Sequence, residues 1–104
     1  MEDMESVITY IKTNFSTVTP RELSRVFFVS VDHLNRIFRK EFYLTTNQYI
    51  IFERICNFER IVTEGECAKK ACLRCGFGDY SNFIRTYKKY RGYTPGEYLR
   101  RISK

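Results

Sequence analysis

Two stretches of this sequence carry the same arrangement of basic and short polar side chains, 49 positions apart. Residues 30–49 align with residues 79–98 without a gap. In each copy four such side chains stand at i, i+4, i+7 and i+8, which places them on one face of a helix. The first stripe is Asp32, Arg36, Arg39 and Lys40, and the second stripe is Ser81, Arg85, Lys88 and Lys89. Arginine and lysine bind phosphates, and arginine also binds the guanine edge, so each stripe has the chemistry of a DNA-binding surface.

The face opposite each stripe is apolar, as it must be if the helix packs against a core. These apolar residues are Val31, Leu34, Ile37, Phe38 and Phe42 in the first copy and Phe83, Tyr87 and Tyr90 in the second. Four aligned pairs are identical: Arg36 with Arg85, Lys40 with Lys89, Thr45 with Thr94, and Tyr49 with Tyr98. A helix with a packed back and a basic, polar front suits insertion into the major groove. Two of them in one short chain indicate a tandem reader of double-stranded DNA.

Composition is consistent with this interpretation. The 104 residues are enough for one domain or two very small helical units, and 43% of them are hydrophobic. The net charge of +6 and the pI near 9.3 favour an anionic partner. Residues 1–52 hold six basic and six acidic side chains, whereas residues 53–104 hold twelve and six. The whole excess therefore lies in the second half, where the alternative interpretation is a solvated, solubilising face.

Glycine and proline are scarce and stand at the ends of apolar-periodic segments, so we predict an all-α fold. The segments Thr19-Pro20-Arg21-Glu22 and Thr94-Pro95-Gly96-Glu97 are expected capping boxes with proline at the first helical position. Seven helices are expected over residues 4–15, 20–27, 31–42, 46–64, 66–74, 79–91 and from 95 onward. They divide into a first helix-turn-helix subdomain (1–45), a linker helix (46–64) and a second helix-turn-helix subdomain (65–104).

The segment from Gly76 to Pro95 reads GFGDYSNFIRTYKKYRGYTP. It closely resembles the signature of the AraC/XylS family of bacterial transcription regulators: a glycine-phenylalanine turn, a serine and an aromatic, an arginine, an aromatic before two lysines, then glycine and a Thr-Pro pair. The first unit matches more loosely. Its matching residues are Leu23, Ser30, Leu34, Arg36 and Phe38. The resemblance covers roughly residues 4–102.

This resemblance implies two helix-turn-helix subdomains held by a rigid linker helix. It also implies that one monomer places its recognition helices, residues 31–42 and 79–91, in successive major grooves on one face of the duplex. A linker of roughly 18 residues spans about 27 Å at 1.5 Å per residue, against a groove spacing of about 34 Å. The target is then an asymmetric site of about two helical turns, because the two reading faces differ.

The family resemblance further implies a regulator that activates more often than it represses, through contact with RNA polymerase. Most relatives carry a separate effector-binding or dimerisation domain, for which 104 residues leave no room. The chain therefore either acts alone, as a monomer controlled by its abundance, or belongs to a longer protein. Acidic residues occupy the place of a basic leader segment, and the longest apolar run is only residues 49–52, so we expect a cytoplasmic, nucleoid-associated protein.

The chain departs from the family pattern after the first recognition helix. Where glycine and proline are usual, it has Tyr43 and Thr46. Either Tyr43 takes a strained left-handed backbone, which is costly for a bulky residue, or the turn is rebuilt. Cysteines 72 and 75 likewise replace the alanine and small aliphatic residue usual before the second turn.

The candidate base contacts combine side-chain chemistry with the family motif. Arginine grips guanine O6 and N7 bidentately, and asparagine does the same for adenine N6 and N7. On this basis Arg36 and Arg85 are the first candidates and Asn35 and Asn82 the next. The family motif adds Asp32, Tyr80 and Ser81. Phosphate contacts are expected further along the stripes, at Arg39, Lys40, Lys88 and Lys89. For each of these residues the alternative is a solvated helix face.

Four cysteines raise the possibility of a metal site, since Cys72 and Cys75 form a C-x-x-C pair. Structural zinc needs two well-spaced ligand pairs, and Cys56 and Cys67 make a poor second pair. We expect buried, reduced thiols, with no metal and no cofactor.

A catalytic function has little support, because the single histidine, His33, has no nucleophile and acid partners and no phosphate loop is present. We predict no catalytic residues. The remaining alternative to a DNA reader is a basic helical module that binds an acidic protein without reading DNA sequence.

Overall fold

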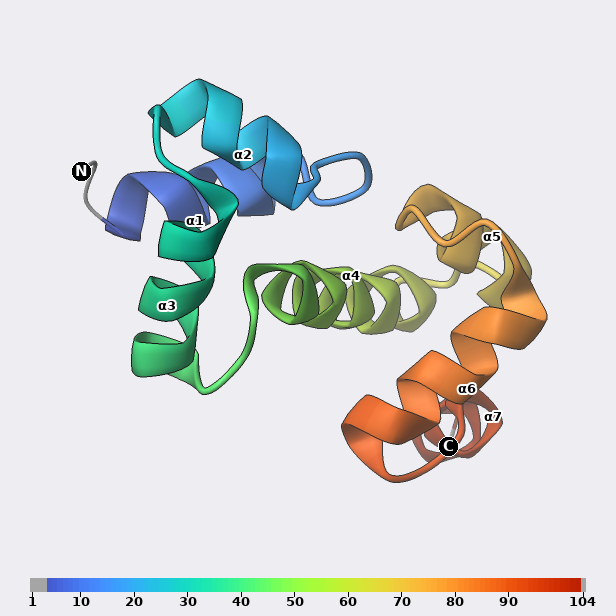
Figure 1. Ribbon diagram of the computed structural model, residues 1–104. Coiled ribbons are helices and arrows are strands. Elements are labelled where there is room, and N and C mark those ends of the chain that lie inside the picture. The colour runs from blue at the N-terminus through green and yellow to red at the C-terminus, as the bar shows by residue number, and fades with distance from the viewer. Residues whose placement is uncertain (1–3, 104) are drawn as a thin grey trace. The chain divides into compact units, whose positions relative to one another are not determined.

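The computed structural model describes residues 4–103, and within them it contains seven helices and no strand (Figure 1). The helices are α1 (Met4–Thr13), α2 (Pro20–Phe27), α3 (Val31–Phe42), α4 (Thr46–Thr63), α5 (Ala68–Arg74), α6 (Tyr80–Arg91) and α7 (Pro95–Ile102). This confirms the all-α prediction. In this part of the chain no helix is both long and apolar enough to cross a membrane.

The chain folds as two compact units that divide between Glu53 and Arg54, inside α4. The first unit contains α1, α2, α3 and the N-terminal half of α4, and the second contains the rest of α4 with α5, α6 and α7. The long helix therefore supplies core residues to both units.

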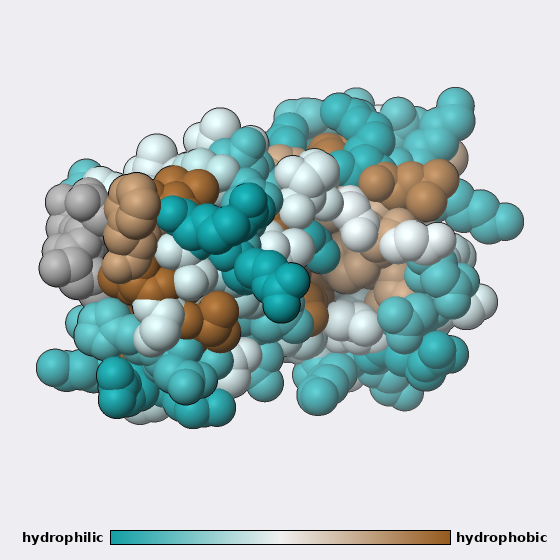
Figure 2. Space-filling view, turned by 45° about the horizontal axis from the view of Figure 1, so that its top comes forward, coloured by the Kyte–Doolittle hydropathy of each residue, from teal (hydrophilic) through white to brown (hydrophobic). Residues whose placement is uncertain are grey.

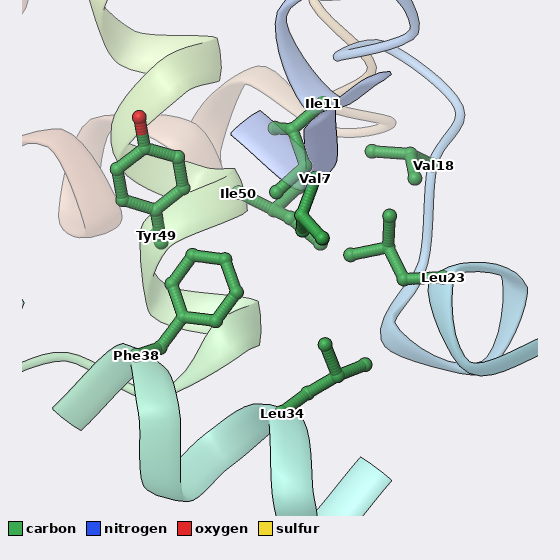
Figure 3. Packing of buried hydrophobic residues seen from close by; sticks show 8 residues of the cluster. All are labelled: Val7, Ile11, Val18, Leu23, Leu34, Phe38, Tyr49 and Ile50. Atoms are coloured by element: carbon green, nitrogen blue, oxygen red, sulfur yellow. The ribbon is translucent and has the colours of Figure 1, made fainter. Parts of the chain in front are cut away.

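The core of the first unit is formed by side chains that α1, α2, α3 and α4 point toward one another (Figure 3). Leu34 and Phe38 on the back of α3 are both fully buried, and the Phe38 ring lies 5.3 Å from that of Tyr49 on α4. The other members of this cluster are Val7, Ile11, Val18, Leu23 and Ile50. The apolar back of α3 therefore rests on the core, as its periodicity predicts, and its polar front is left outside.

The core of the second unit is an aromatic cluster centred on Phe83 of α6. Its ring centroid lies 4.5 Å from that of Phe58 on α4 and 4.6 Å from that of Phe77 in the turn before α6. Tyr87, one turn further along α6, is also fully buried. Because offset and edge-on ring pairs stabilise a core beyond their buried area, this cluster fixes which face of α6 points inward.

Of the two predicted capping boxes, one forms completely and the other only in part. The Thr94–Glu97 capping box forms in both directions. Thr45 and Gln48 make the same reciprocal pair at the start of α4, which the sequence analysis did not identify. The predicted box at Thr19 is half formed, because Thr19 accepts from the Glu22 backbone while the Glu22 carboxylate accepts from the hydroxyl of Tyr10.

The caps of α3 and α6 follow the sequence closely. Ser30 accepts a hydrogen bond from the His33 backbone, and Asp79 accepts one from the Ser81 backbone, so each helix begins directly after its polar cap. The expected helix over residues 66–74 instead begins at Ala68, after an N-cap residue, Cys67, that makes no side-chain cap hydrogen bond.

The turn after α3 uses the first of the two conformations considered for Tyr43. This residue adopts a left-handed backbone with φ 61° and ψ 26°, and its N–H donates to the Arg39 carbonyl at 3.0 Å. Gly92 takes the same place after α6, with φ 82°. The tyrosine therefore accepts the strain that glycine avoids, and the helix ends in the same way in both copies.

Candidate nucleic-acid interface

Both polar stripes face outward. All eight of their side chains are exposed, whereas Leu34, Phe38, Phe83 and Tyr87 behind them are buried; Phe42, expected on the apolar back of α3, is 37% exposed. Hydrophilic side chains also cover most of the face drawn in Figure 2, with apolar groups showing between them. The helices α3 and α6 therefore each expose their arginine, lysine and short polar groups to solvent, and each unit holds its own helix in place.

The two candidate base-reading arginines are held in the same way. The Nη2 atom of Arg36 lies 3.3 Å from Nδ1 of His33, and Nη2 of Arg85 lies 3.3 Å from Oδ1 of Asn82. His33 and Asn82 are aligned in the repeat, three residues before their arginines. Sequence reasoning missed this role, although the shared register was a signal for it. A guanidinium partly oriented before binding loses less rotamer freedom when it meets a base.

Asn35 has a structural partner that the sequence analysis did not foresee. Its Oδ1 accepts a hydrogen bond from the Thr46 backbone N–H at 3.0 Å, which ties α3 to the first residue of α4. An asparagine needs both its oxygen and its nitrogen for a bidentate adenine contact. In this conformation the oxygen is already used, and Oδ1 of Asn82 likewise accepts from Arg85, so neither amide presents both of its groups to an adenine.

In the second copy the connection between the recognition helix and the helix that follows it is arranged differently. Thr46 is aligned with Pro95, and Asn35 is aligned with Ile84. Proline has no N–H to satisfy, so no amide acceptor is needed beside it. The Thr46 hydroxyl, in contrast, is fully buried and has no hydrogen-bond partner within the described part of the chain.

We therefore expect Thr46→Pro to stabilise the protein by about 0.5–1 kcal/mol, because proline is favoured at the first helical position and the unpaired hydroxyl is lost. Asn35→Ile alone is expected to cost about 1 kcal/mol, because it leaves the Thr46 N–H unpaired. In the Thr46→Pro background the Asn35→Ile cost should vanish. Urea unfolding of both single variants and the double variant measures this coupling, and an equal Asn35→Ile cost in both backgrounds contradicts it.

Tyr80 and the remaining base candidates differ in how far they project. Asp32, Ser81 and Asn82 are exposed. Tyr80 is half-buried, and its ring stacks on Phe83 with centroids 6.1 Å apart. Burial raises the pKa of the Tyr80 hydroxyl. Much of Tyr80 thus belongs to the edge of the aromatic core, and only the remainder of the side chain is available to a base.

Glu59 of α4 holds the C-terminal end of α6. Its carboxylate accepts hydrogen bonds from the Tyr87 hydroxyl at 2.6 Å and from Nε and Nη2 of Arg91 at 2.9 and 2.8 Å. The hydrogen bonds to Glu59 raise the pKa of Arg91, and burial followed by the same carboxylate raises the pKa of Tyr87. A bidentate arginine–carboxylate pair fixes orientation as well as distance, so this network sets the angle of α6 on α4.

The two units carry very different charges. Residues 1–53 hold six basic and seven acidic side chains, and residues 54–104 hold twelve and five. The recognition helices follow the same trend, since α3 contains Asp32 and Glu41 while α6 contains no acidic residue. Attraction to the phosphate backbone therefore comes mainly from the second unit.

The cysteines lie apart from both stripes. Cys72 and Cys75 are fully buried, and burial raises the pKa of the Cys75 thiol to about 11. Their thiols are thus protonated at neutral pH and poorly nucleophilic. The prediction of buried thiols is wrong for Cys67, which is exposed, and Cys56 is half-buried. Within residues 4–103 no group of three or more metal-ligating side chains comes together.

A family model described as a helix-turn-helix domain matches residues 23–101. The uncharacterised HTH-type transcriptional regulator YpdC of Escherichia coli K12 is 26% identical over 99 residues, which cover 93% of this chain and 35% of YpdC. The chain spans about a third of the length of the E. coli relatives it matches.

Solved structures show the same fold. A DNA-binding transcriptional dual regulator from E. coli K-12 has a TM-score of 0.81 at 24% identity, covering 99% of this chain and 95% of the other. A probable AraC family transcriptional regulator from Rhodopseudomonas palustris CGA009 has a TM-score of 0.78 at 22% identity, covering 94% of each chain. Because the family model covers most of the chain and the segment from Gly76 to Pro95 carries the AraC/XylS signature, this protein belongs to the helix-turn-helix family of AraC-type DNA-binding domains.

Proposed function

We propose that this protein is a sequence-specific transcription regulator that reads an asymmetric DNA site with α3 and α6 in successive major grooves. The observation that carries the proposal is the pair of exposed stripes, each with an arginine at the same register and a partner three residues earlier. The 18 residues of α4 correspond to about 27 Å of helix, comparable to the spacing of adjacent grooves.

The proposed contacts divide by position along each helix. Residues near the N-terminal ends of α3 and α6 contact base edges: Asp32, Asn35, Arg36, Tyr80, Ser81, Asn82 and Arg85. Residues one or two turns further along contact phosphates: Arg39, Lys40, Lys88 and Lys89. The base contacts select the sequence, and the phosphate contacts set the register of the protein on the duplex.

The regulatory part of the proposal rests on the resemblance to the AraC/XylS family. We propose that the protein activates transcription rather than represses it, through contact with RNA polymerase. We also propose that it binds DNA as a monomer. A monomer is sufficient because one chain already carries two recognition helices. Sedimentation of the chain with and without its selected site tests the monomer directly.

The primary experiment is selection of binding sites from random duplex DNA, followed by Arg85→Ala on the selected site. We expect an asymmetric site of roughly 20 base pairs covering two helical turns. Arg85→Ala should weaken binding to it by about 10- to 100-fold and relax the preference at one base position, because a bidentate contact to guanine is lost.

Lys88→Ala is the matched control, since it lies on the same stripe but is assigned to a phosphate. It should weaken binding to selected and random duplexes alike. Uniform weakening by Arg85→Ala would remove it from the base-reading set. A selection that enriches no sequence, with weak salt-sensitive binding to any DNA, would overturn the reader and leave a basic protein-interaction module.

A further inference from the structure

Tyr43 is a bulky residue in a conformation that favours glycine. Its backbone is left-handed at the C-cap of α3, and its side chain is 89% exposed. The aligned residue of the second copy, Gly92, has the same kind of backbone, and a Cβ placed there would meet no atom within 4 Å. The turn itself therefore requires no side chain. The Tyr43 ring is therefore exposed to an external partner at the end of α3.

The position of Tyr43 on α3 connects it to the first stripe. It follows Asp32, Arg36 and the pair Arg39–Lys40 at the same spacing of three or four residues. Its N–H still donates to the Arg39 carbonyl, so its Cα continues the helical path. Tyr43 thus lies directly after the last residue of α3, beyond the residues assigned to phosphates.

The first unit has little positive charge with which to attract phosphates, so uncharged hydrogen-bond donors are a larger share of what it can offer them. That unit has one more acidic than basic side chain, and α3 itself carries Asp32 and Glu41. The second unit has seven more basic than acidic side chains and keeps glycine at the aligned position. A phenol can donate a hydrogen bond to a phosphate without carrying a charge.

We propose that Tyr43 is a DNA-backbone contact of the first unit. Its hydroxyl donates to a phosphate oxygen and its ring packs on the adjoining deoxyribose. The inference rests on the proposed function, because it requires α3 to lie in the groove. Such a contact neutralises no phosphate, so it adds affinity without adding to the salt dependence of binding.

The test is Tyr43→Gly in the full chain, measured on the selected site at several salt concentrations. Stability and binding should move in opposite directions. The melting temperature should rise by a few degrees, because glycine relieves the left-handed backbone. Affinity should fall about tenfold with an unchanged salt slope, since a hydrogen bond to a charged group is lost without loss of a cation. Tyr43→Phe, which keeps the ring, should lose several-fold.

Phe28 offers a matched control. It also has a left-handed backbone, with φ 55°, and its side chain is 93% exposed, but it lies in the turn before the Ser30 cap and outside the first stripe. Phe28→Gly should raise the melting temperature similarly and leave the affinity unchanged. An equal loss of affinity in both glycine variants would overturn the assignment, because the loss would then come from the flexibility of glycine in the turn and not from the missing tyrosine.

Two other outcomes would also overturn the inference while leaving the proposed function intact. One is that Tyr43→Gly binds the selected site with wild-type affinity, while Arg85→Ala still loses its preference for one base of that site. The other is unchanged DNA affinity with loss of self-association or of binding to a protein, which would make Tyr43 a protein contact. If the unmodified chain selects no DNA sequence, the proposed function itself fails, so the two failures are distinguishable.

Discussion

Glu59→Ala is expected to destabilise the second unit by about 3 kcal/mol. The substitution removes three hydrogen bonds at once and leaves the Arg91 guanidinium, whose side chain is only 25% exposed, without its carboxylate. It also removes the Glu59 acceptor from the hydroxyl of the buried Tyr87. Removing one partner of a largely buried ion pair costs far more than the pair contributes, because the remaining charge keeps its desolvation penalty. Urea unfolding followed by circular dichroism measures the loss.

The matched control is Glu64→Ala, five residues later and just beyond the end of α4. Glu64 pairs with Arg60 at 3.3 Å, but both side chains are more than half exposed, so its removal should cost less than about 0.5 kcal/mol. Glu59→Gln keeps an acceptor and should recover part of the loss. If Glu59→Ala proved as mild as Glu64→Ala, the network would not hold α6 on α4.

Lys88→Ala combined with Lys89→Ala is expected to weaken DNA binding by about 100-fold at low salt. Each lysine is exposed on the second stripe and is assigned to one phosphate, and charge-assisted hydrogen bonds are among the stronger polar contacts. The slope of log K against log salt should become shallower by about 1.8, which is 0.9 for each phosphate no longer neutralised. Titrations of the selected site and of a random duplex at four or five salt concentrations measure both quantities.

The aligned pair of the first stripe is the internal control for this experiment. Arg39→Ala with Lys40→Ala removes the same charge at the same register and should change the slope equally. Because the first unit has almost no net charge, the variant that retains the second stripe should still bind random DNA better. A loss confined to the selected site in either double variant would assign those residues to bases.

The positions of the recognition helices could be predicted closely because their signals are local. Ser30 and Asp79 cap the two helices through hydrogen bonds to backbone groups two or three residues away. Apolar residues at helical spacing then decide which face turns inward, and Leu34, Phe38, Phe83 and Tyr87 are all buried as expected. Since the basic stripes lie opposite these residues, their exposure follows from the same periodicity. The base and phosphate assignments themselves remain predictions.

Contacts between residues distant in sequence could not be predicted in the same way. Asn35 appeared on sequence grounds to be free for a base, yet its oxygen binds Thr46, eleven residues later. Glu22 was expected to complete a cap box, but Tyr10, twelve residues earlier, donates to its carboxylate. Each of these side chains had a reasonable local or external partner, and only the packing of two helices brought the competing group within reach.

By itself the sequence determined the all-α class, the repeated recognition helices, the family and the charge difference between the halves of the chain. These follow from composition, short-range capping and helical periodicity, which depend on residues within a few turns of one another. The tertiary structure alone decided how Glu59 orients α6, how Asn35 joins α3 to α4, and how Tyr10 takes the Glu22 carboxylate from its predicted cap. Those outcomes depend on which polar groups and ring faces are brought together when separate helices pack, and no local pattern contains that information.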